Sequence, residues 1–232
     1  MKHMYRTLAA SSLLAVAAGS WSGEIYAAQP GFYAGGNYQQ STFDARPEQF
    51  DAVMASLYDL FGFTVTAYTP SFDDEDAGYE FLAGYRIYEW LALEAGYMDL
   101  GAVTHRASAT IASDGDPLTI DSKLETDVKG IALSALGIWQ ATERFSLYGR
   151  AGLLLADGNT SVHLTDGVSS FRDSASESQE GLLWGVGAGF EFAEIYTLRL
   201  EYRQVTDVGN ETTTGKIDAE SISLGLIVAF GF

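Results

Sequence analysis

Residues 221–232 read Ser-Ile-Ser-Leu-Gly-Leu-Ile-Val-Ala-Phe-Gly-Phe, and this stretch alternates between large apolar side chains and mostly small ones. Successive side chains of a β-strand point to opposite faces, so the large ones share one face. They are Ile222, Leu224, Leu226, Val228, Phe230 and Phe232. The stretch therefore predicts a strand with one bulky apolar face and one face of small residues.

Similar alternation recurs along the chain and predicts eight strands. They lie near 31–42, 77–87, 90–101, 126–140, 145–159, 179–192, 196–208 and 219–232. Connections of a few residues, at 88–89, 141–144 and 193–195, alternate with long ones at 43–76, 102–125, 160–178 and 209–218. Past residue 28 no apolar run approaches the length of a membrane helix. Even strand number and alternating connection length predict an all-β fold, an eight-stranded antiparallel up-and-down transmembrane β-barrel with short periplasmic turns and long external loops.

The two strand faces predict which side of the barrel meets lipid. A face of glycine, serine, alanine and charges would make a poor dry core, so we expect the bulky face to meet lipid. Aromatic residues gather near the short turns and the C-terminus, which predicts a girdle at one membrane interface. They are Tyr85, Tyr88, Trp90, Trp139, Phe145, Phe190, Phe192, Tyr196, Phe230 and Phe232.

These features resemble the small eight-stranded outer-membrane barrels typified by the transmembrane domain of outer membrane protein A. The likeness is carried by Gly31-Phe32-Tyr33-Ala34-Gly35, by the strand Leu198–Arg203 and by the alternating end. The resemblance implies the outer membrane of a Gram-negative bacterium. It also implies that Phe230 and Phe232 form a C-terminal signal for the barrel assembly machinery. The chain ends with the barrel, so we do not expect a peptidoglycan-binding domain.

The N-terminus predicts a secretory signal. Lys2 and Arg6 precede a short apolar run, 8–19, and small residues follow up to Ala28. A membrane-spanning helix needs about 20 apolar residues, so this run is too short for one. We expect residues 1–28 to be a signal peptide and residues 29–232 to be the barrel domain; the alternative is a retained amphipathic helix.

Charge and composition limit the possible partners. The chain has 31 acidic and 13 basic residues, a formal charge of -18, and no cysteine. Nucleic-acid binding needs basic surface, so it is not expected. The four long connections hold 17 of the acids and 5 of the bases, which predicts an acidic exterior. Outer-membrane lipid and lipopolysaccharide are the expected surroundings, with a possible external ligand bound by the loops, and we expect a monomer.

Some charges fall on the predicted inner face, four acidic and four basic. They are Glu80, Arg86, Glu94, Arg150, Glu191, Arg199, Glu201 and Arg203. Unpaired charges inside a narrow barrel would be costly, so we expect an ion-pair network that plugs the interior. In that arrangement Glu191 would lie opposite Arg199, and glycines 181, 185, 187 and 189 would make room for the arginines. A polar conduit or gate is the alternative.

The first long connection carries an apolar pattern of helical spacing. Pro47 can open a helix whose apolar residues recur every three or four positions and which ends at Gly62. Such a helix could lie on the membrane, cover the barrel mouth, bind a partner or pack on its own barrel. The segment 63–68 is expected to extend the second strand above the membrane.

Metal, cofactor and catalytic motifs do not emerge. The run Asp73–Asp76 lacks calcium-loop spacing, so a solvated charge run is expected, with a weak calcium or magnesium site as the alternative. Gly-x-Gly-x-Gly at 185–189 lies inside a strand and opens no phosphate-binding turn. His105 and His163 lie near serines in long connections, without the paired base and nucleophile that catalysis requires. We therefore expect no metal, cofactor or enzyme activity. The expected role is structural or surface interaction; a narrow pore or small-molecule carrier is the alternative.

Overall fold

The computed structural model describes residues 29–44, 47–60, 62, 64–112, 117–166, 168–192, 195–208 and 217–230. The expected signal peptide, Phe232 and most of the last long connection lie outside the described residues.

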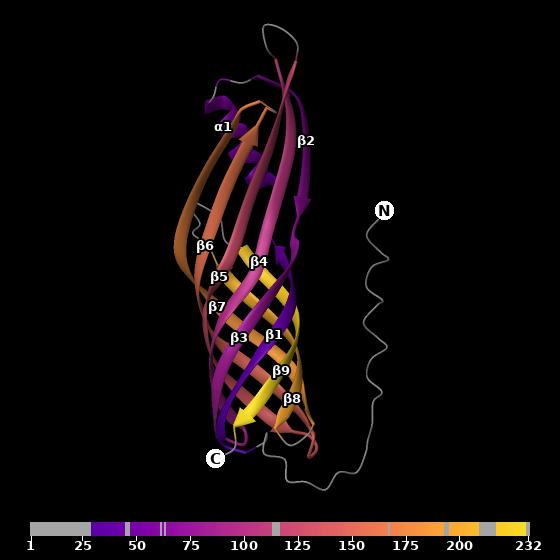
Figure 1. Cartoon of the computed structure of the whole chain (residues 1–232), viewed down its shortest axis with the longest axis vertical. Helices are drawn as coiled ribbons and strands as arrows, with labels where there is room; N and C mark the ends of the chain where they lie inside the picture. The colour runs from indigo at the N-terminus through magenta and orange to yellow at the C-terminus, as the bar shows by residue number, and fades with distance from the viewer. Residues whose placement is uncertain are drawn as a thin grey trace, which may run out of the picture.

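Eight antiparallel strands close into a ring (Figure 1). In ring order they are β1 (Gly31–Asp44), β3 (Glu75–Tyr88), β4 (Leu91–Ile111), β5 (Leu118–Gln140), β6 (Phe145–Thr165), β7 (Ser170–Phe192), β8 (Tyr196–Val208) and β9 (Ile217–Phe230). Pairing of β9 with β1 closes the ring, with Phe32 opposite Phe230. The predicted eight-stranded barrel is confirmed.

Four of the strands continue far beyond the barrel on the side away from the short turns. Strands β4 to β7 are 21 to 23 residues long and form a sheet that rises above the barrel. The predicted loops 102–125 and 160–178 are therefore mostly strand. Their faces are polar or mixed, so apolar alternation could not reveal them. We call this part the extracellular sheet.

The ninth strand, β2 (Val65–Asp73), belongs to the extracellular sheet rather than to the ring. It pairs with the upper half of β4, and only Asp74 separates it from β3, which pairs with the lower half. Strands β2 and β3 thus form one nearly continuous edge along β4. The predicted extension of the second strand above the membrane is confirmed.

A β-bulge in β4 marks the boundary between barrel and extracellular sheet. Asp99 pairs with Lys129 and Ala102 with Asp127, so β4 carries one extra residue. Gly101 has φ of 90°, which favours glycine, and its N–H donates to the Asp99 carboxylate at 2.9 Å. Below the bulge even-numbered β4 residues face inward, and above it odd-numbered ones do.

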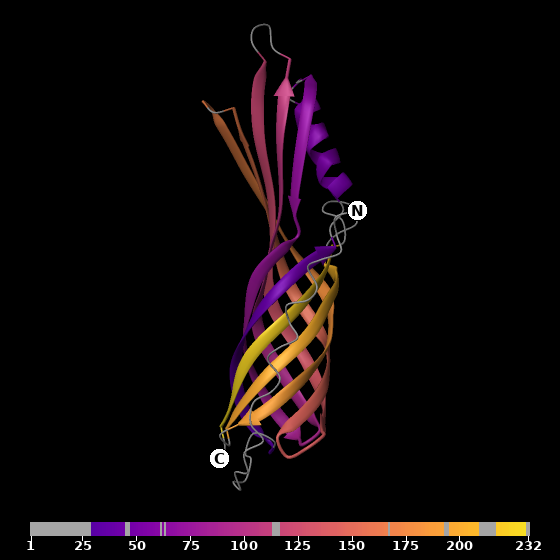
Figure 2. The same ribbon diagram turned by 90° about the vertical axis from the view of Figure 1, so that its right-hand side faces the viewer.

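The helix α1 (Pro47–Leu60) lies beside β2 above the barrel (Figure 2). The predicted helix is confirmed. Met54 and Tyr58 are buried in a cluster with Ala109, Ile111, Ile120 and Leu164. These strand residues lie on the face that continues the barrel interior, so the helix packs on its own extracellular sheet rather than on the membrane.

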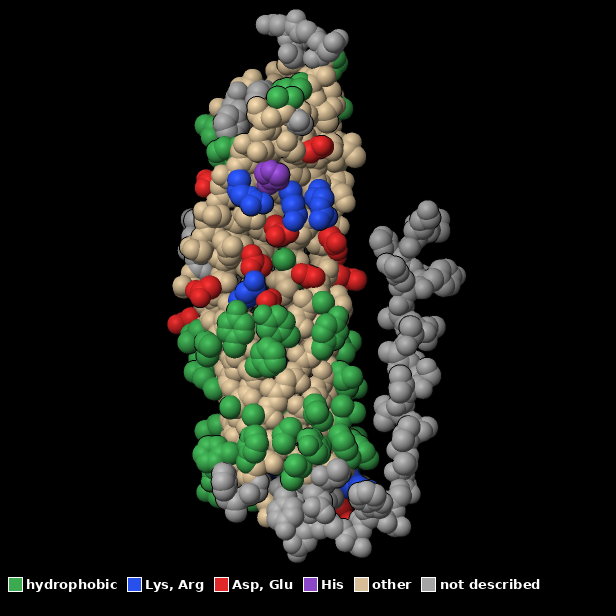
Figure 3. All heavy atoms as spheres, viewed as in Figure 1, with side chains coloured by type: hydrophobic (Ala, Val, Ile, Leu, Met, Phe, Trp, Pro, Cys, Tyr) green, Lys and Arg blue, Asp and Glu red, His purple; other side chains and the backbone are tan. Residues whose placement is uncertain are grey.

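Bulky side chains cover the outside of the barrel, as the faces predicted. Figure 3 shows two apolar belts, one near the short turns and one below the extracellular sheet. The lower belt includes Trp90 and Trp139, both mostly exposed. The upper belt, with Tyr79, Phe81 and Tyr97, was not predicted. No helix within the described residues is long and apolar enough to cross a membrane.

Candidate functional site

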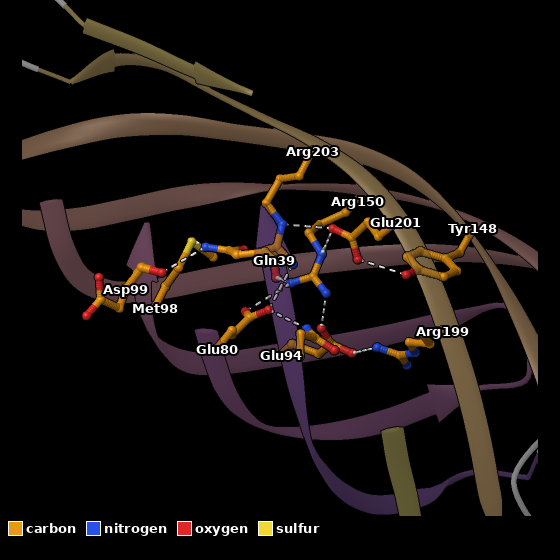
Figure 4. A network of polar contacts seen from close by, with 12 residues as sticks. Gln39, Glu80, Glu94, Met98, Asp99, Tyr148, Arg150, Arg199, Glu201 and Arg203 are labelled. Carbon is orange, nitrogen blue, oxygen red and sulfur yellow. Dashed lines mark hydrogen bonds and ion pairs between the residues drawn. The ribbon is translucent and has the colours of Figure 1, made fainter. Parts of the chain in front are cut away.

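The charged centre of the barrel is built around Arg150 of β6 (Figure 4). Its guanidinium nitrogens lie 2.6 Å from a carboxylate oxygen of Glu94, 2.9 Å from one of Glu201 and 3.6 Å from one of Glu80. The contacts with Glu94 and Glu201 are ion pairs whose N–H groups do not point at the carboxylate oxygens, so they are not hydrogen bonds. The Nη1 group of Arg150 donates a hydrogen bond to Ser134 Oγ at 3.1 Å. One arginine thus joins carboxylates from three other strands, β3, β4 and β8.

Two arginines of β8 complete the charge balance. Arg203, fully buried, places Nη2 2.8 Å from Glu80 and Nε 2.9 Å from Glu201. Arg199 places Nη1 2.5 Å from Glu94. Three arginines therefore meet three glutamates. Because each charge has an opposite partner in a site closed to water, the desolvation cost is offset within the cluster.

Neutral side chains add hydrogen bonds to the three carboxylates. Tyr33 donates its hydroxyl to Glu94 at 2.7 Å, Tyr148 to Glu201 at 2.8 Å, and Asn37 its amide to Glu80 at 2.6 Å. The guanidinium of Arg199 also lies 5.4 and 5.2 Å from the ring centroids of Tyr33 and Tyr148. Sequence reasoning missed these three residues, although Tyr148 lies two positions from Arg150 and so shares its predicted inner face.

The structure does not join the other two predicted members to this cluster. Arg86 and Glu191 are buried in the barrel, but no ion pair joins them to another of the described residues. Glu191 accepts a hydrogen bond from Gln140 at 3.3 Å. The expectation that Glu191 lies opposite Arg199 is wrong. Phe192 pairs with Tyr196 across the turn, which puts Glu191 opposite Thr197.

Arg199 instead lies opposite Gly189 and reaches across the interior to Glu94. Gly185 and Gly187 of β7 also lie against other groups than the predicted arginine side chains. A Cβ on Gly187 would lie 2.4 Å from Cζ of Tyr148, and one on Gly185 would lie 2.8 Å from the Tyr202 carbonyl oxygen. Gly187 therefore makes room for the tyrosine that bonds Glu201, rather than for an arginine.

Apolar layers lie above and below the ion pairs. On the extracellular side Phe43, Leu100, Val128, Leu154 and Leu183 belong to one buried cluster. On the periplasmic side Leu82, Leu136, Ile138 and Ile227 belong to another, together with Tyr33 and Tyr148. The ion pairs therefore lie between two buried apolar clusters. The inner face is more apolar than its glycines and charges indicated.

The two histidines considered for catalysis have different surroundings. His105 is buried beneath α1, with Nε2 3.1 Å from Asp51, whose carboxylate also accepts the Tyr68 hydroxyl at 2.7 Å. Burial and this hydrogen bond raise the pKa of Tyr68. His163 lies opposite Lys123 and Arg172 on the outer face of the extracellular sheet. Asp166 caps the β6–β7 turn, where the N–H groups of Ser169 and Val168 lower its pKa.

The acidic run at residues 73–76 meets the β4 bulge. Asp76 accepts hydrogen bonds from the backbone N–H of Ala102 and from its own neighbour Ala77, both at 2.8 Å. In the described part of the chain no group of three or more acidic, histidine or cysteine side chains is placed to hold a metal ion. Asp76 thus has a structural role at the bulge.

The chain is similar to a known family of membrane proteins. A family model described as the OmpA-like transmembrane domain matches residues 27–232. The chain belongs to this family. The OmpA-like barrel is 30% identical over 227 residues to the 31 kDa outer-membrane immunogenic proteins of Brucella melitensis biotype 1 and Brucella suis biovar 1. The match covers 91% of this chain and 84% of each relative.

Two solved structures are among those similar to the OmpA-like barrel. Neisserial surface protein A matches with 17% identity and a TM-score of 0.46, over 86% of this chain and 97% of that one. Ail, the attachment invasion locus protein of Yersinia pestis, matches with 14% identity and a TM-score of 0.44, over 87% and 99%. With its family and its outer-membrane relatives, the chain is an integral outer-membrane β-barrel of a Gram-negative bacterium.

Proposed function

We propose that this protein is a closed, non-enzymatic barrel that holds an extracellular sheet above the outer membrane for surface interaction. The observation that carries the proposal is the position of Arg150, whose ion pairs reach from β6 to β3, β4 and β8. A cross-link of this kind across the narrow lumen supports a plugged barrel. The name of the Brucella relatives, outer-membrane immunogenic protein, supports a role at the cell surface.

The packed layers strengthen the case for a closed barrel. An ion crossing the lumen would have to pass the periplasmic apolar cluster, the ion pairs and the extracellular apolar cluster in turn. An eight-stranded barrel is just wide enough for side chains to fill it. The ion-pair network is therefore proposed to act as a structural plug.

Planar-bilayer recording tests the plug. The wild-type protein is expected to show no steady conductance. Arg150→Ala is expected to remain silent as well, because both apolar layers still fill the lumen. Lys129→Ala, which removes an outward-facing charge, is the matched control. Steady conductance through the wild type would overturn the proposal.

The alternative function is a narrow pore or carrier, in which the ion pairs form a gate. It predicts that conductance or liposome uptake of small solutes begins once Arg150→Ala or Glu201→Ala breaks the network. Both variants should be checked for a folded barrel by heat-modifiable migration, in which the unboiled protein runs differently on a detergent gel. Conductance limited to these two variants would favour the gate.

The remaining proposed properties concern assembly and chemistry. We expect a monomer surrounded by lipid and lipopolysaccharide, inserted by the barrel assembly machinery through Phe230 and Phe232. The absence of enzyme activity rests on the two histidines: His105 contacts Asp51 under α1, and His163 lies between two basic residues. Hydrolysis of lipid A or peptides that disappears in His163→Ala would contradict it.

A further inference from the structure

Basic side chains form a straight row across the outer face of the extracellular sheet. Arg106 of β4 lies opposite Lys123 of β5, Lys123 opposite His163 of β6, and His163 opposite Arg172 of β7. Residues that are direct partners across strands share a face. The row therefore crosses four adjacent strands on the side of the sheet that faces away from α1. We call these four residues the basic row.

The basic row stands out against the charge of its surroundings. The four long connections hold 17 acidic and only 5 basic residues, yet 3 of those 5 belong to the row. Like charges directly opposite each other on a sheet are destabilising. Figure 3 shows the basic side chains gathered in one band with acidic ones below them. Such segregation concentrates positive potential on one band of an otherwise acidic protein.

Most of the row's charge is available to a ligand. Lys123 forms an ion pair with Glu125, next to it on the same face. By contrast, neither Arg106 nor Arg172 makes an ion pair with any residue that the structure describes, and both are exposed. The two guanidinium groups at the ends of the row therefore remain free to bind an anion with paired N–H groups.

A surface pocket adjoins one end of the row. It has a volume of about 200 Å³ and is lined by Arg106, Lys123 and His163 together with Ser108, Asp121, Ser122 and Thr165. The Asp121 carboxylate accepts the Ser108 hydroxyl at 2.5 Å, so its charge is partly satisfied within the pocket. Cationic and hydroxyl groups thus converge on a concave site that one anionic group could enter.

The size and height of the row indicate the kind of ligand. Adjacent strands lie 4.7–4.9 Å apart, so three intervals from Arg106 to Arg172 span about 14 Å. Lys123 stands six residues beyond Lys129, which lies just above the upper apolar belt, and this corresponds to about 20 Å along the strand. The headgroup region adds only about 5–8 Å to each side of the hydrocarbon core, so the row lies beyond the lipid headgroups. A chain bearing several anionic groups matches the row better than a single small ion.

We propose that the basic row binds an anionic saccharide carrying sulfate or phosphate groups. Arg106 and Arg172 hold anionic groups at the two ends, and Lys123 and His163 contact the saccharide between them. The saccharide could come from a sulfated glycan outside the cell or from the phosphorylated sugar core of lipopolysaccharide. This inference rests on the proposed surface role, for which it names the ligand class.

The test measures binding of saccharides to the full-length protein in uncharged detergent. The probes are short dextran sulfate and phosphorylated core oligosaccharide released from lipopolysaccharide, with unmodified dextran as the uncharged control. The variant removes three charges, as Arg106→Gln, Lys123→Gln and Arg172→Gln together. Lys129→Gln is the matched single-charge control, because Lys129 faces outward but pairs with Asp127 at 2.9 Å. Heat-modifiable migration verifies that each variant is folded.

Wild-type protein should bind at least one anionic probe, and added salt should weaken the binding. The triple variant should lose affinity on the order of tenfold or more. Lys129→Gln should bind with the affinity of the wild type. The probe that binds more tightly identifies the source of the saccharide. Equal affinity of the triple variant and wild type, equal loss in Lys129→Gln, or equal binding of unmodified dextran would overturn the inference. These outcomes do not bear on the plug, because the absence of conductance in bilayer recording tests the plug separately.

Discussion

At the scale of single residues, Arg150 matters most because so many buried charges depend on it. Its guanidinium is within ion-pair distance of three glutamates, and its side chain is 1% exposed. Removing it would leave an excess of negative charge in a closed interior. Breaking a buried pair by removing one partner is generally far more costly than replacing the whole pair with packed apolar groups.

We expect Arg150→Met to lower the free energy of unfolding by about 3–5 kcal/mol. Urea unfolding in phospholipid vesicles measures it. The control Lys129→Met, which removes a largely exposed cation, should cost less than about 1 kcal/mol. The double variant Arg150→Met with Glu201→Gln should regain part of the loss, because one excess charge is removed. A loss in Arg150→Met no larger than in the control would contradict the described network.

Two glycines on neighbouring strands provide a second test at the residue scale. A Cβ on Gly187 would clash with Tyr148 and approach the Leu200 carbonyl oxygen at 2.8 Å, whereas a Cβ on Gly149 would meet nothing within 4 Å. We expect Gly187→Ala to destabilise by about 1–3 kcal/mol and Gly149→Ala to be neutral or slightly stabilising. The same unfolding measurement compares them. Equal effects at both positions would show that Gly187 makes no special room.

At the scale of elements, α1 is held by apolar packing and by one polar cluster. Met54 is fully buried against the extracellular sheet, and Asp51 connects His105 with Tyr68. The polar cluster depends on the Tyr68 proton, because the neutral hydroxyl donates to the carboxylate. Docking of the helix is thereby coupled to the ionisation of one tyrosine.

Because the pKa of Tyr68 is raised above the ordinary value of about 10, the neutral form is favoured in the docked state. Its contribution should be complete below about pH 10 and decline as the pH rises above 10 toward the raised pKa. A spin label at Ser56→Cys, unique because the chain has no cysteine, should become more mobile in that range. In Tyr68→Phe the donor is absent, so this step should vanish. Constant label mobility up to pH 12 would rule out the coupling.

At the scale of the whole molecule, the sequence predicted the membrane-embedded part well. Lipid imposes a strict apolar alternation there, as at Leu182, Trp184 and Val186. Above the membrane, residues 170–178 of β7 show no such alternation, so the strand extensions could not be recognised. The sequence also could not predict which arginine pairs with which glutamate. Arg199 and Glu94 are 105 residues apart, and closure of the ring rather than the nearest turn brings them together.

The division into barrel and extracellular sheet predicts that the barrel folds without the sheet. A chain in which short glycine-serine turns replace residues 45–73, 106–122 and 163–172 keeps all members of the ion-pair network. We expect it to retain heat-modifiable migration and to lose binding of anionic saccharide. A truncated chain that migrates identically before and after boiling would show that the sheet is needed for barrel formation.

The extra residue in β4 has a consequence for how this protein can tolerate changes in length. The bulge at Gly101 fixes the parity of every β4 position above it, turning His105 toward α1 and Arg106 toward the outer face. A single deletion there would exchange the two faces of the upper half of β4. The histidine would then point outward, and the arginine would be forced against the helix. Point substitutions on the outer face carry no such penalty, so its chemistry can change freely while the length of this strand must stay constant.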